Sequence, residues 1–576
     1  MKVPQALLAA RAVGPVVILV ASACVGAPPA ATGPSASAAE VPQRGGRIVA
    51  AGGIDVQTLN PMLAAEVTST FAAGLIYASL YAVDPKTGEL SPDLGSWTVS
   101  ADGLTYRWTI KASASWSDGK PIVGQDYLTA VKAVARSKVT VRKPNFQEVA
   151  GFAEYRDGIA NAISGVTLDP TDPKKFAVRF VRAFCPALAN AFGQSAGPLP
   201  TQVFGKYVVD DDVTKNVDAA PENVAPPVAS GPFKFRESRK GELVTLDRNE
   251  TYFKGAPFVD QFVFRVTGVG AQVGLVKSGD ANFTRGVQQS DLTELRGHDD
   301  LVLHRYPVNG YTFIGWNTRS ATAPALADKR VRQALAYALD MDAVVRSVLL
   351  GEGARAVAHH PPTSWAYPDR RTLDPYPFDR AKAEDLLHQA GYAKGADGLY
   401  AKDGKALAFT ILAPSAGQAS WDGLLETAVE QYRALGVKAS PEHAPFQAVT
   451  DRLDTGNLEA WILGWSLGLD PDPYSIWHSS QIPDAATKKP GFNSGGFTAP
   501  GLDRAIEEGR TPANGDCSQA ARKKSYETVD RILNDEQPYN FGFAANQFVL
   551  TSKSLRGVDP GTYAIFWNVE RWWIKP

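Results

Sequence analysis

The segment from residue 461 to residue 481, WILGWSLGLDPDPYSIWHSSQ, holds the densest group of side chains that could bind or transform a ligand. Two tryptophans, a tyrosine, a histidine and two aspartates fall between Trp465 and His478. Pro471 and Pro473 remove backbone donors and favour extended geometry before them, so we predict a strand that ends in an irregular loop, not a helix. Such a loop either packs its rings onto its own domain or forms a ligand platform at the end of a strand.

A literal G-x-S-x-G motif, Gly464 to Gly468, lies in the same segment and suggests a secreted serine hydrolase that uses Ser466. In such hydrolases the motif joins a strand to a helix, but the prolines that follow oppose a helix. The only downstream histidine, His478, lies twelve residues on in the same loop and is badly placed as a general base. We therefore predict no catalytic residue. Ser466→Ala would abolish turnover by a hydrolase and leave binding by a receptor largely intact.

The other histidines and the glycine-rich stretches predict neither a metal site nor a cofactor. His359 and His360 are adjacent and precede two prolines, so they cannot chelate as a helical i, i+4 pair would. Asp470 and Asp472 lack the downstream glycine and glutamate of a calcium loop. No P-loop occurs, and the stretch from residue 268 to 274 misses the dinucleotide fingerprint by one position.

Length and composition indicate a large globular chain with several domains. Its 576 residues suggest two to four domains, at about 100–200 residues for each. Lysine and arginine number 59 against 60 aspartates and glutamates, so the chain lacks the basic surplus that nucleic-acid-binding domains usually carry. We expect no nucleic-acid partner. The 44% hydrophobic content, with 12 Trp, 19 Tyr and 25 Phe, fits a well-packed body.

The first 44 residues are predicted to be a targeting segment and a tether outside the fold. Residues 12–23 form an apolar run that is too short to span a bilayer, which takes about 20 residues. Cys24 follows small residues as in a bacterial lipobox, which predicts a signal peptide over residues 1–23 and a lipid anchor on Cys24. A plain secretory signal is the alternative. Residues 24–44 have the composition of a flexible tether, so we expect the body outside the cytoplasm.

The two remaining cysteines are Cys185 and Cys517. An oxidising compartment permits a disulfide between them. Two free, buried thiols are an equally open alternative, because the sequence does not place the two residues in contact.

Upstream of residue 305 the sequence is rich in predicted strands. Residues 104–110 alternate between apolar and polar side chains, as a half-buried strand does. Helices are predicted over residues 70–80 and 125–136. Residues 231–236 and 243–249 form a predicted hairpin, followed by a strand over residues 259–266.

Downstream of residue 305 helices and strands alternate. Asp328, Asp340 and Asp379 each precede a helical pattern and are predicted N-caps. Between residues 409 and 463 we predict strands over 409–412, 437–439 and 460–463, separated by helices over 424–435 and 446–453. This alternation implies a parallel sheet with right-handed crossovers. The segment after residue 464 then lies just past the carboxyl end of a parallel strand, where open α/β sheets place ligand crevices.

Five stretches, taken in order, resemble one family: the extracellular solute-binding proteins of ABC importers in the peptide and nickel group, family 5. The most specific of them is FIGWNTRSATAPALADKRVRQALAYALDMDAVVRSVLLGEGARA, in which Arg332, Gln333, Ala334 and Asp340 take the family's usual places. The other four stretches are residues 90–134, 230–266, 378–392 and 464–481. Together the five span nearly all of the chain from Gly45 onward.

The resemblance implies an α/β fold of the periplasmic-binding-protein type, in its large three-subdomain form (class II). Two lobes are joined by a hinge, a third subdomain is inserted, and the lobes close over a ligand in the cleft between them. The expected ranges are 45–78, 200–305 and 545–576 for lobe I, 79–199 for the inserted subdomain II, and 306–544 for lobe III.

The resemblance also implies a function without catalysis. A receptor of this family binds an oligopeptide or a similar extended solute and delivers it to a membrane permease with its ATPase. Alternatives within the same fold are receptors for sugars, metal chelates or other solutes, or a receptor that feeds a sensor. We expect a monomer. Trp465, Asp470 and Tyr474 are the first candidates for ligand binding, and Asn317, Trp421 and the Thr58 to Asn60 turn are weaker ones.

One departure from the family bears on the ligand. Peptide receptors of this group carry an aspartate, three residues after the tryptophan of the Gly-Trp pair, that pairs with the amino terminus of the peptide. Here that position is Gly468. Asp470 would reach the amino terminus of a bound peptide only if the loop has a different shape. A buried ammonium group needs a carboxylate partner. The alternative for each candidate residue is a loop side chain packed inside one lobe.

Overall fold

The structure is a computed structural model that describes residues 40–576, except 53–54, 194–195, 211, 213, 416–417, 488 and 490. The predicted signal peptide and the lipidation site Cys24 therefore lie outside the described residues. Within the described part of the chain, no helix is both long enough and apolar enough to cross a membrane.

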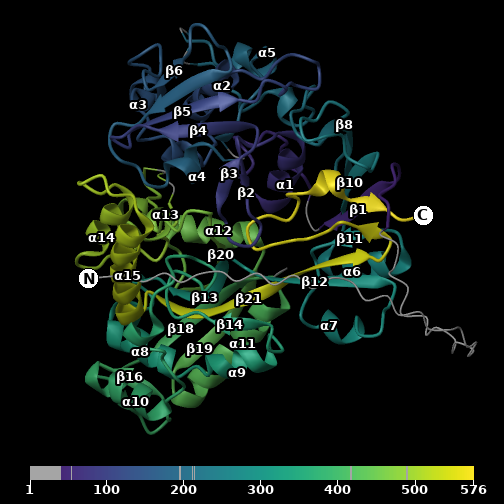
Figure 1. Cartoon of the computed structure of the whole chain (residues 1–576). Coiled ribbons are helices and arrows are strands. Elements are labelled where there is room, and N and C mark those ends of the chain that lie inside the picture. Colours follow the sequence, from purple (N-terminus) through teal and green to yellow (C-terminus); the bar gives the residue numbers. More distant parts are fainter. Residues whose placement is uncertain are drawn as a thin grey trace, which may run out of the picture. The chain divides into compact units, whose positions relative to one another are not determined.

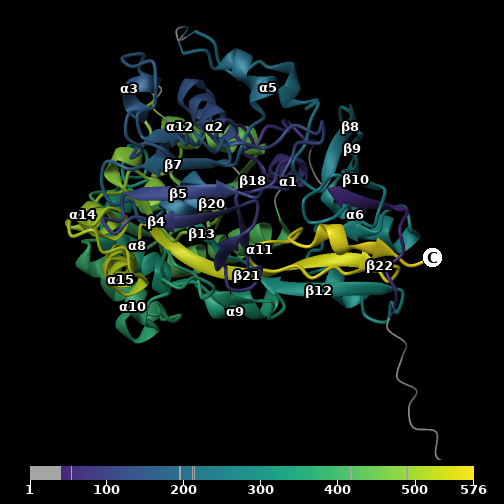
Figure 2. The same ribbon diagram turned by 45° about the horizontal axis from the view of Figure 1, so that its top comes forward.

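A twelve-stranded sheet is built around strand β21, Tyr539–Ser552 (Figures 1 and 2). The first part of β21 pairs with β13 (Gly310–Trp316) and β14 (Gly353–Arg355), both antiparallel. The second part pairs with β11 (Phe283–Thr284) and β12 (Leu301–Pro307), also antiparallel. Because β12 leads directly into β13, the chain passes from one half of the sheet to the other in two neighbouring strands.

The half of the sheet in the predicted lobe I combines parallel and antiparallel strands. β1 (Arg47–Gly52) pairs in parallel with β10 (Gln261–Val266) and with β11. β9 (Leu243–Arg248) and β8 (Phe233–Arg239) continue the sheet as an antiparallel hairpin, as predicted. The helices of this region are α1 (Val67–Ile76), which ends before the predicted residue 80, α6 (Val269–Ser278) and α7 (Asp291–Glu294).

The predicted subdomain II contains a separate antiparallel sheet in the order β4-β5-β7-β6. The clearest predicted strand is confirmed as β5 (Thr105–Ile110), and the predicted helix over residues 125–136 is confirmed as α2 (Gly124–Arg136). The carboxylate of Asp126 in the first turn of α2 accepts from the backbone N–H of Val123 at 3.0 Å and so stabilises the helix start. The other elements here are β4 (Gly95–Val99), β6 (Val166–Leu168), β7 (Lys175–Arg179), α3 (Phe152–Arg156), α4 (Ala187–Ala191) and α5 (Thr201–Phe204), with the small hairpin β2 (Tyr81–Val83) and β3 (Leu90–Pro92) leading in.

The predicted lobe III contains three helices whose caps are confirmed. Asp328, Asp340 and Asp379 each accept a backbone hydrogen bond at the start of a helix, which satisfies one of the free N–H groups there. The helices are α8 (Lys329–Tyr337), α9 (Met341–Ser347) and α10 (Arg380–Gln389). A small antiparallel sheet follows, with β15 (Ala393–Lys394), β16 (Tyr400–Lys402) and β17 (Lys405–Ala406).

The predicted βαβ run is confirmed, but the sheet that it joins is mixed. β18 (Ala408–Pro414) pairs in parallel with β19 (Lys438–Ala444) and β20 (Ala460–Ser466). Helices α11 (Ala419–Leu435) and α12 (Phe446–Thr455) connect them. The prediction of a parallel sheet is wrong beyond β20, because its other neighbour, β13, is antiparallel to it. β13 enters from β12 without a crossover helix, and nothing therefore forces it to run parallel.

A disulfide between Cys185 and Cys517 joins two segments that lie 332 positions apart in the sequence. Cys185 follows β7 in subdomain II, and Cys517 lies between α14 (Leu502–Arg510) and α15 (Gln519–Glu536) in lobe III. The backbone N–H of Cys185 also donates to the carbonyl of Arg510 at 2.9 Å. The disulfide thus ties the predicted subdomain II covalently to the predicted lobe III. The assignment of residue ranges to lobes stays a prediction.

Candidate functional site

The end of β20 and the segment after it form a wall of a small cavity. Trp465, Leu467, Gly468 and Asp470 line the cavity, and His359 lines it from another part of the chain. Its volume is about 140 Å³, well below the roughly 300–1,000 Å³ of ordinary ligand pockets. The cavity is therefore large enough for one part of a ligand and too small for a whole peptide.

The end of this segment differs from the prediction. Residues Tyr474–Trp477 form a single helical turn, α13, which begins directly after Pro473. The expectation that no helix occurs here is wrong for these four residues. Proline is tolerated at the start of a helix because the first N–H groups have no intrahelical partner.

The loop lies against the half of the molecule that contains lobe I and subdomain II. The side chain of Leu469 packs against the hydrophobic core of that half. Burial and then the nearby charge of Asp470 raise the pKa of Tyr81, which belongs to β2. The residues that line the cavity all lie between positions 359 and 492, and the same loop contacts the other half through Leu469.

The carboxylate of Asp470 is held by Arg522 of α15. The two guanidinium nitrogens Nη1 and Nη2 donate to the two carboxylate oxygens at 2.8 and 2.6 Å. Arg522 also donates from Nε to the carbonyl of Gly509 at 2.9 Å and from Nη2 to the hydroxyl of Tyr526 at 2.8 Å. Both charged side chains are less than a tenth exposed. A ligand ammonium would have to compete with this bidentate pair for Asp470.

Asp472 has an equivalent partner. Arg510, the last residue of α14, donates to its carboxylate, and both side chains are 6% exposed. The Arg510 guanidinium also lies over the ring of Tyr474, 4.1 Å from its centroid. Burial raises the pKa of Asp472, while the charge of Arg510 lowers it, and the net direction is upward. Both acids of the loop are therefore occupied within the protein.

The two candidate tryptophans lie on opposite faces of β20. Trp465 lines the cavity and stacks on Phe313, with ring centroids 6.1 Å apart and planes at 15°. Trp421, in α11, lies near Gly464, and its Nε1 donates to the hydroxyl of Thr312 at 3.3 Å. Because successive residues of a strand point to opposite faces, the structure does not bring the two rings together.

Tyr474 faces away from the cavity. Its hydroxyl contacts the hydroxyl of Ser480 at 2.9 Å, and its ring stacks on His478 at 4.4 Å between centroids. Its contacts thus join α13 to the turn that follows. The residue stabilises the wall of the cavity from behind.

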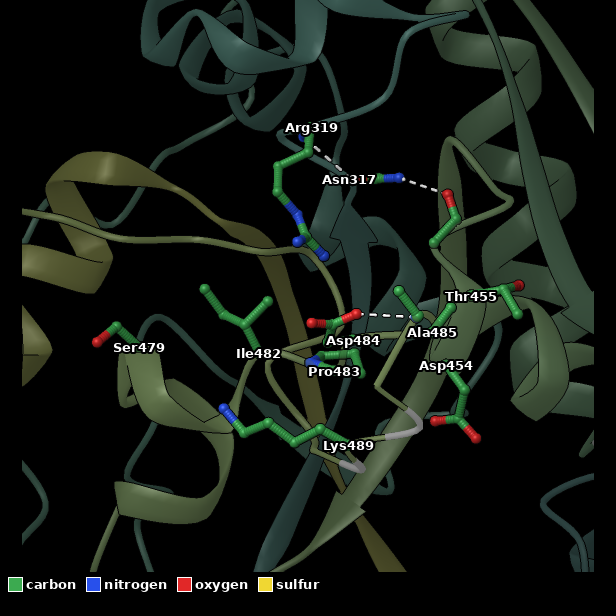
Figure 3. Close-up of a pocket in the computed structure, with 12 residues that line it drawn as sticks. Asn317, Arg319, Asp454, Thr455, Ser479, Ile482, Pro483, Asp484, Ala485 and Lys489 are labelled. Carbon is green, nitrogen blue, oxygen red and sulfur yellow. Dashed lines mark hydrogen bonds between the residues drawn. The ribbon is translucent and has the colours of Figure 1, made fainter.

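Asn317 lies beside a different and larger cavity of about 550 Å³, which is shown with its lining residues in Figure 3. Its amide nitrogen donates to the carbonyls of Gly456 and Leu458 at 3.0 and 2.8 Å, and its oxygen accepts from the N–H of Arg319 at 3.0 Å. These bonds fix the turn that precedes β20. These hydrogen bonds within the protein account for the burial of Asn317.

Asn60 is likewise engaged within the protein. It is 1% exposed, donates to the side-chain oxygen of Asn223 at 2.8 Å and accepts from the N–H of Met62 at 3.0 Å. Thr58 in the same turn donates from its hydroxyl to the carbonyl of Asn223 at 3.2 Å. The turn is held within its own lobe and lies outside both cavities.

Ser466 has no catalytic partner in the part of the chain that the structure describes. It is exposed at the end of β20. The imidazole of His478 contacts the hydroxyl of Ser480 at 2.7 Å and the carboxylate of Glu507 at 3.3 Å, not Ser466. A nucleophile hydrogen-bonded to a base, which a hydrolase needs, is not found among these residues.

Two buried histidines beneath the loop, His359 and His360, were not predicted to belong to this site. His360 Nδ1 lies 2.7 Å from the carboxylate of Asp530, and its Nε2 lies 2.8 Å from the carbonyl of Pro471. An ionised carboxylate and a carbonyl only accept hydrogen bonds, so beside them both ring nitrogens carry protons and the ring is an imidazolium, in line with the raised pKa of His360. Asp530 is 170 residues away in the sequence, which is why spacing alone gave no signal.

His360 predicts a pH dependence of stability. Burial alone would lower its pKa, but the charge and hydrogen bond of Asp530, with the Pro471 carbonyl, raise it above its usual value. A group whose pKa is raised on folding stabilises the protein below its unfolded pKa, about 6.5, and loses that effect as pH rises through the folded pKa. We expect His360→Gln to lower the free energy of unfolding by about 1–3 kcal/mol at pH 5.5 and by less at pH 9.

Urea unfolding of both proteins at the two pH values checks this. His443→Gln, at a ring that is 46% exposed beside Asp422, controls for the loss of a histidine as such. A deficit in His360→Gln that grows with pH would contradict the assignment of a buried imidazolium.

Comparisons with known proteins found a matching family model, similar chains and similar solved structures. The family model for bacterial extracellular solute-binding proteins, family 5 Middle, matches residues 89–485. The oligopeptide-binding protein AppA of Bacillus subtilis (strain 168) is 27% identical over 573 residues, which cover 96% of each chain. A solved structure of AppA from Bacillus subtilis in complex with a nonapeptide has a TM-score of 0.78 at 25% identity, covering 93% of this chain and 100% of that one. A periplasmic EDTA-binding protein, EppA, shares the fold with a TM-score of 0.79 at 19% identity, covering 93% and 98%.

Proposed function

Because this chain belongs to family 5 of the bacterial extracellular solute-binding proteins, we propose that its ligand is an oligopeptide or a similarly extended solute held between its two halves. Members of the family are extracytoplasmic receptors of ABC importers and not enzymes. The observation that carries the peptide assignment is the match to the oligopeptide-binding protein AppA, which extends over 96% of both chains.

The geometry of the loop supports this proposal. The cavity beside Trp465 has room for part of a ligand, and the loop that lines it also carries Leu469, which packs against the core of the other half. A peptide in extended form meets such a site with backbone groups and with side chains that alternate in direction. The serine hydrolase alternative is not favoured, since Ser466 has no base among the residues that the structure describes and the family consists of receptors.

Attachment and delivery complete the proposal. Lipidation of Cys24 would hold the receptor at the outer face of the membrane, where a permease with its ATPase takes over the solute. The chain would act as a monomer. Metabolic labelling with a lipid precursor, compared between the natural chain and Cys24→Ala, tests the anchor independently of ligand binding.

A thermal-shift screen of residues 45–576 tests the proposed ligand class. We expect peptides of two to eight residues to raise the melting temperature, because a ligand at about 100 times its Kd adds about 2.7 kcal/mol to the folded state. Oligosaccharides and nickel chelates serve as controls and are expected to have no effect. A shift with a sugar or chelate, and none with any peptide, would contradict the peptide assignment and leave only the receptor fold.

A further inference from the structure

One ring nitrogen of His359 has no hydrogen-bond partner among the described residues. His359 Nδ1 lies 3.0 Å from the indole nitrogen of Trp477 and 3.0 Å from the hydroxyl of Tyr311. An indole nitrogen only donates, so Nδ1 must accept, and in the neutral ring the proton is on Nε2. The side chain is 1% exposed and lines the cavity beside Trp465. With Nδ1 turned toward Trp477 and Tyr311, the Nε2 edge is left to face the cavity.

The surroundings keep this ring neutral. Burial lowers the pKa of His359 far below its usual value, and the charged ring of His360 beside it acts in the same direction. The two rings are 4.7 Å apart between centroids. Because His360 is held as a cation by Asp530 and Pro471, a second proton on His359 would place two positive charges side by side. The Nε2–H donor is therefore present over the whole pH range in which His360 is charged.

The carboxylates of the cavity are, by contrast, engaged. Asp470 is paired with Arg522, and Asp472 is paired with Arg510. Both guanidinium groups are almost fully buried and reach the acids from α14 and α15. A cationic group in this cavity finds no carboxylate that is free to pair with it, whereas an oxygen acceptor finds an N–H donor.

We propose that His359 is a ligand-binding residue whose Nε2–H donates a hydrogen bond to an oxygen of the bound solute, either a peptide carbonyl or a terminal carboxylate. The cavity then receives an oxygen-bearing part of the ligand and not its amino terminus. This inference rests on the proposed peptide function and specifies which chemical group of the peptide occupies the site beside Trp465.

The energetic reason lies in the burial of the donor. A hydrogen bond to a ligand oxygen that forms inside the protein is electrostatically stronger than the same bond in water. A ligand that places an apolar or cationic group there gains nothing from the donor. His359 thereby distinguishes ligands by the group that they present to this cavity.

Three variants separate ligand contact from packing. His359→Asn keeps an acceptor near the position of Nδ1 for Trp477 but cannot reach the position of Nε2. His359→Gln places an amide donor near the position of Nε2. Tyr311→Phe is the matched control, because it removes a neighbour of Nδ1 and leaves Nε2 unchanged.

The measurement is isothermal titration calorimetry with the peptide that gives the largest thermal shift, as free acid, C-terminal amide and N-acetyl forms. We expect His359→Asn to weaken binding at least about fivefold, His359→Gln to recover part of the loss, and Tyr311→Phe to change affinity less than about twofold. The acceptor is the terminal carboxylate if two results hold. Amidation of the peptide must weaken its binding to the natural protein, and the natural protein and His359→Asn must then bind the amidated peptide with equal affinity. If amidation changes nothing, the acceptor is a carbonyl.

Two results would overturn the inference. Equal affinities of the natural protein and His359→Asn, with peptides still bound, would show that Nε2 does not contact the ligand. A loss of more than about tenfold on N-acetylation of the peptide that disappears in His359→Asn would place the amino terminus, and not an oxygen, beside His359. If no peptide binds to any form, the proposed function itself fails, which the thermal-shift screen reveals before any variant is made.

Discussion

Arg522→Met is expected to lower the free energy of unfolding by about 3–5 kcal/mol, the largest effect that we predict for a single substitution. Arg522 is buried, pairs with both oxygens of Asp470, and donates to the Gly509 carbonyl and the Tyr526 hydroxyl. Methionine fills much of the same volume but leaves Asp470 as a buried carboxylate without a partner. The charge of Asp472 nearby adds like-charge repulsion.

Denaturant unfolding at neutral pH measures the loss. Arg504→Met in α14 is the matched control, because Arg504 is 81% exposed and pairs with Glu508 only across the helix surface at 3.8 Å. The control is expected to change stability by less than about 1 kcal/mol. A second test is the double variant Arg522→Met with Asp470→Leu, which removes the stranded charge and should recover part of the loss. Equal losses in Arg522→Met and Arg504→Met would refute the role of the buried pair.

Removal of the disulfide has the second largest expected effect. Replacement of both Cys185 and Cys517 by alanine is expected to lower the free energy of unfolding by about 2–5 kcal/mol. The bond connects residues 332 positions apart, and long loops restrict the unfolded chain most in the chain-entropy account of such bonds. The loss is also expected when the natural protein is unfolded in the presence of a thiol reductant.

The reductant provides the internal control for this prediction. It should destabilise the natural protein and leave the double-alanine variant unchanged, because that variant has no bond to reduce. Alkylation of the unfolded, unreduced protein followed by mass spectrometry gives an independent count of free thiols. Modification of both cysteines without prior reduction would show that the bond does not form.

Short sequence patterns correctly predicted the elements that depend on residues close together in the chain. Asp328, Asp340 and Asp379 cap helices as expected, because capping needs only a short polar side chain next to the helix start. The alternation over residues 104–110 predicted β5 for the same reason. Strand β13 was not predicted, since all seven of its residues are buried and it shows no alternation between buried and exposed positions.

The internal pairing of the candidate site was not predicted. Trp465 and Asp470 line the cavity, and their role in ligand binding stays a prediction. The sequence did not reveal that Asp470 is held by Arg522 or that His360 is held by Asp530, which are 52 and 170 residues away from their partners. Contacts over such separations depend on the topology of the whole chain, which residue types in one segment do not encode.

Strand β21 has a consequence for how the protein reaches its native state. It supplies hydrogen-bond partners to β13 and β14 along its first part and to β11 and β12 along its second part, yet it lies at residues 539–552. Neither half of the sheet is complete before this late segment arrives, so assembly depends on pairings between distant parts of the chain, which form slowly. Until then β13 and β11 expose unpaired edges that favour aggregation. A chain truncated before residue 539 would lose the edge partners of both halves together.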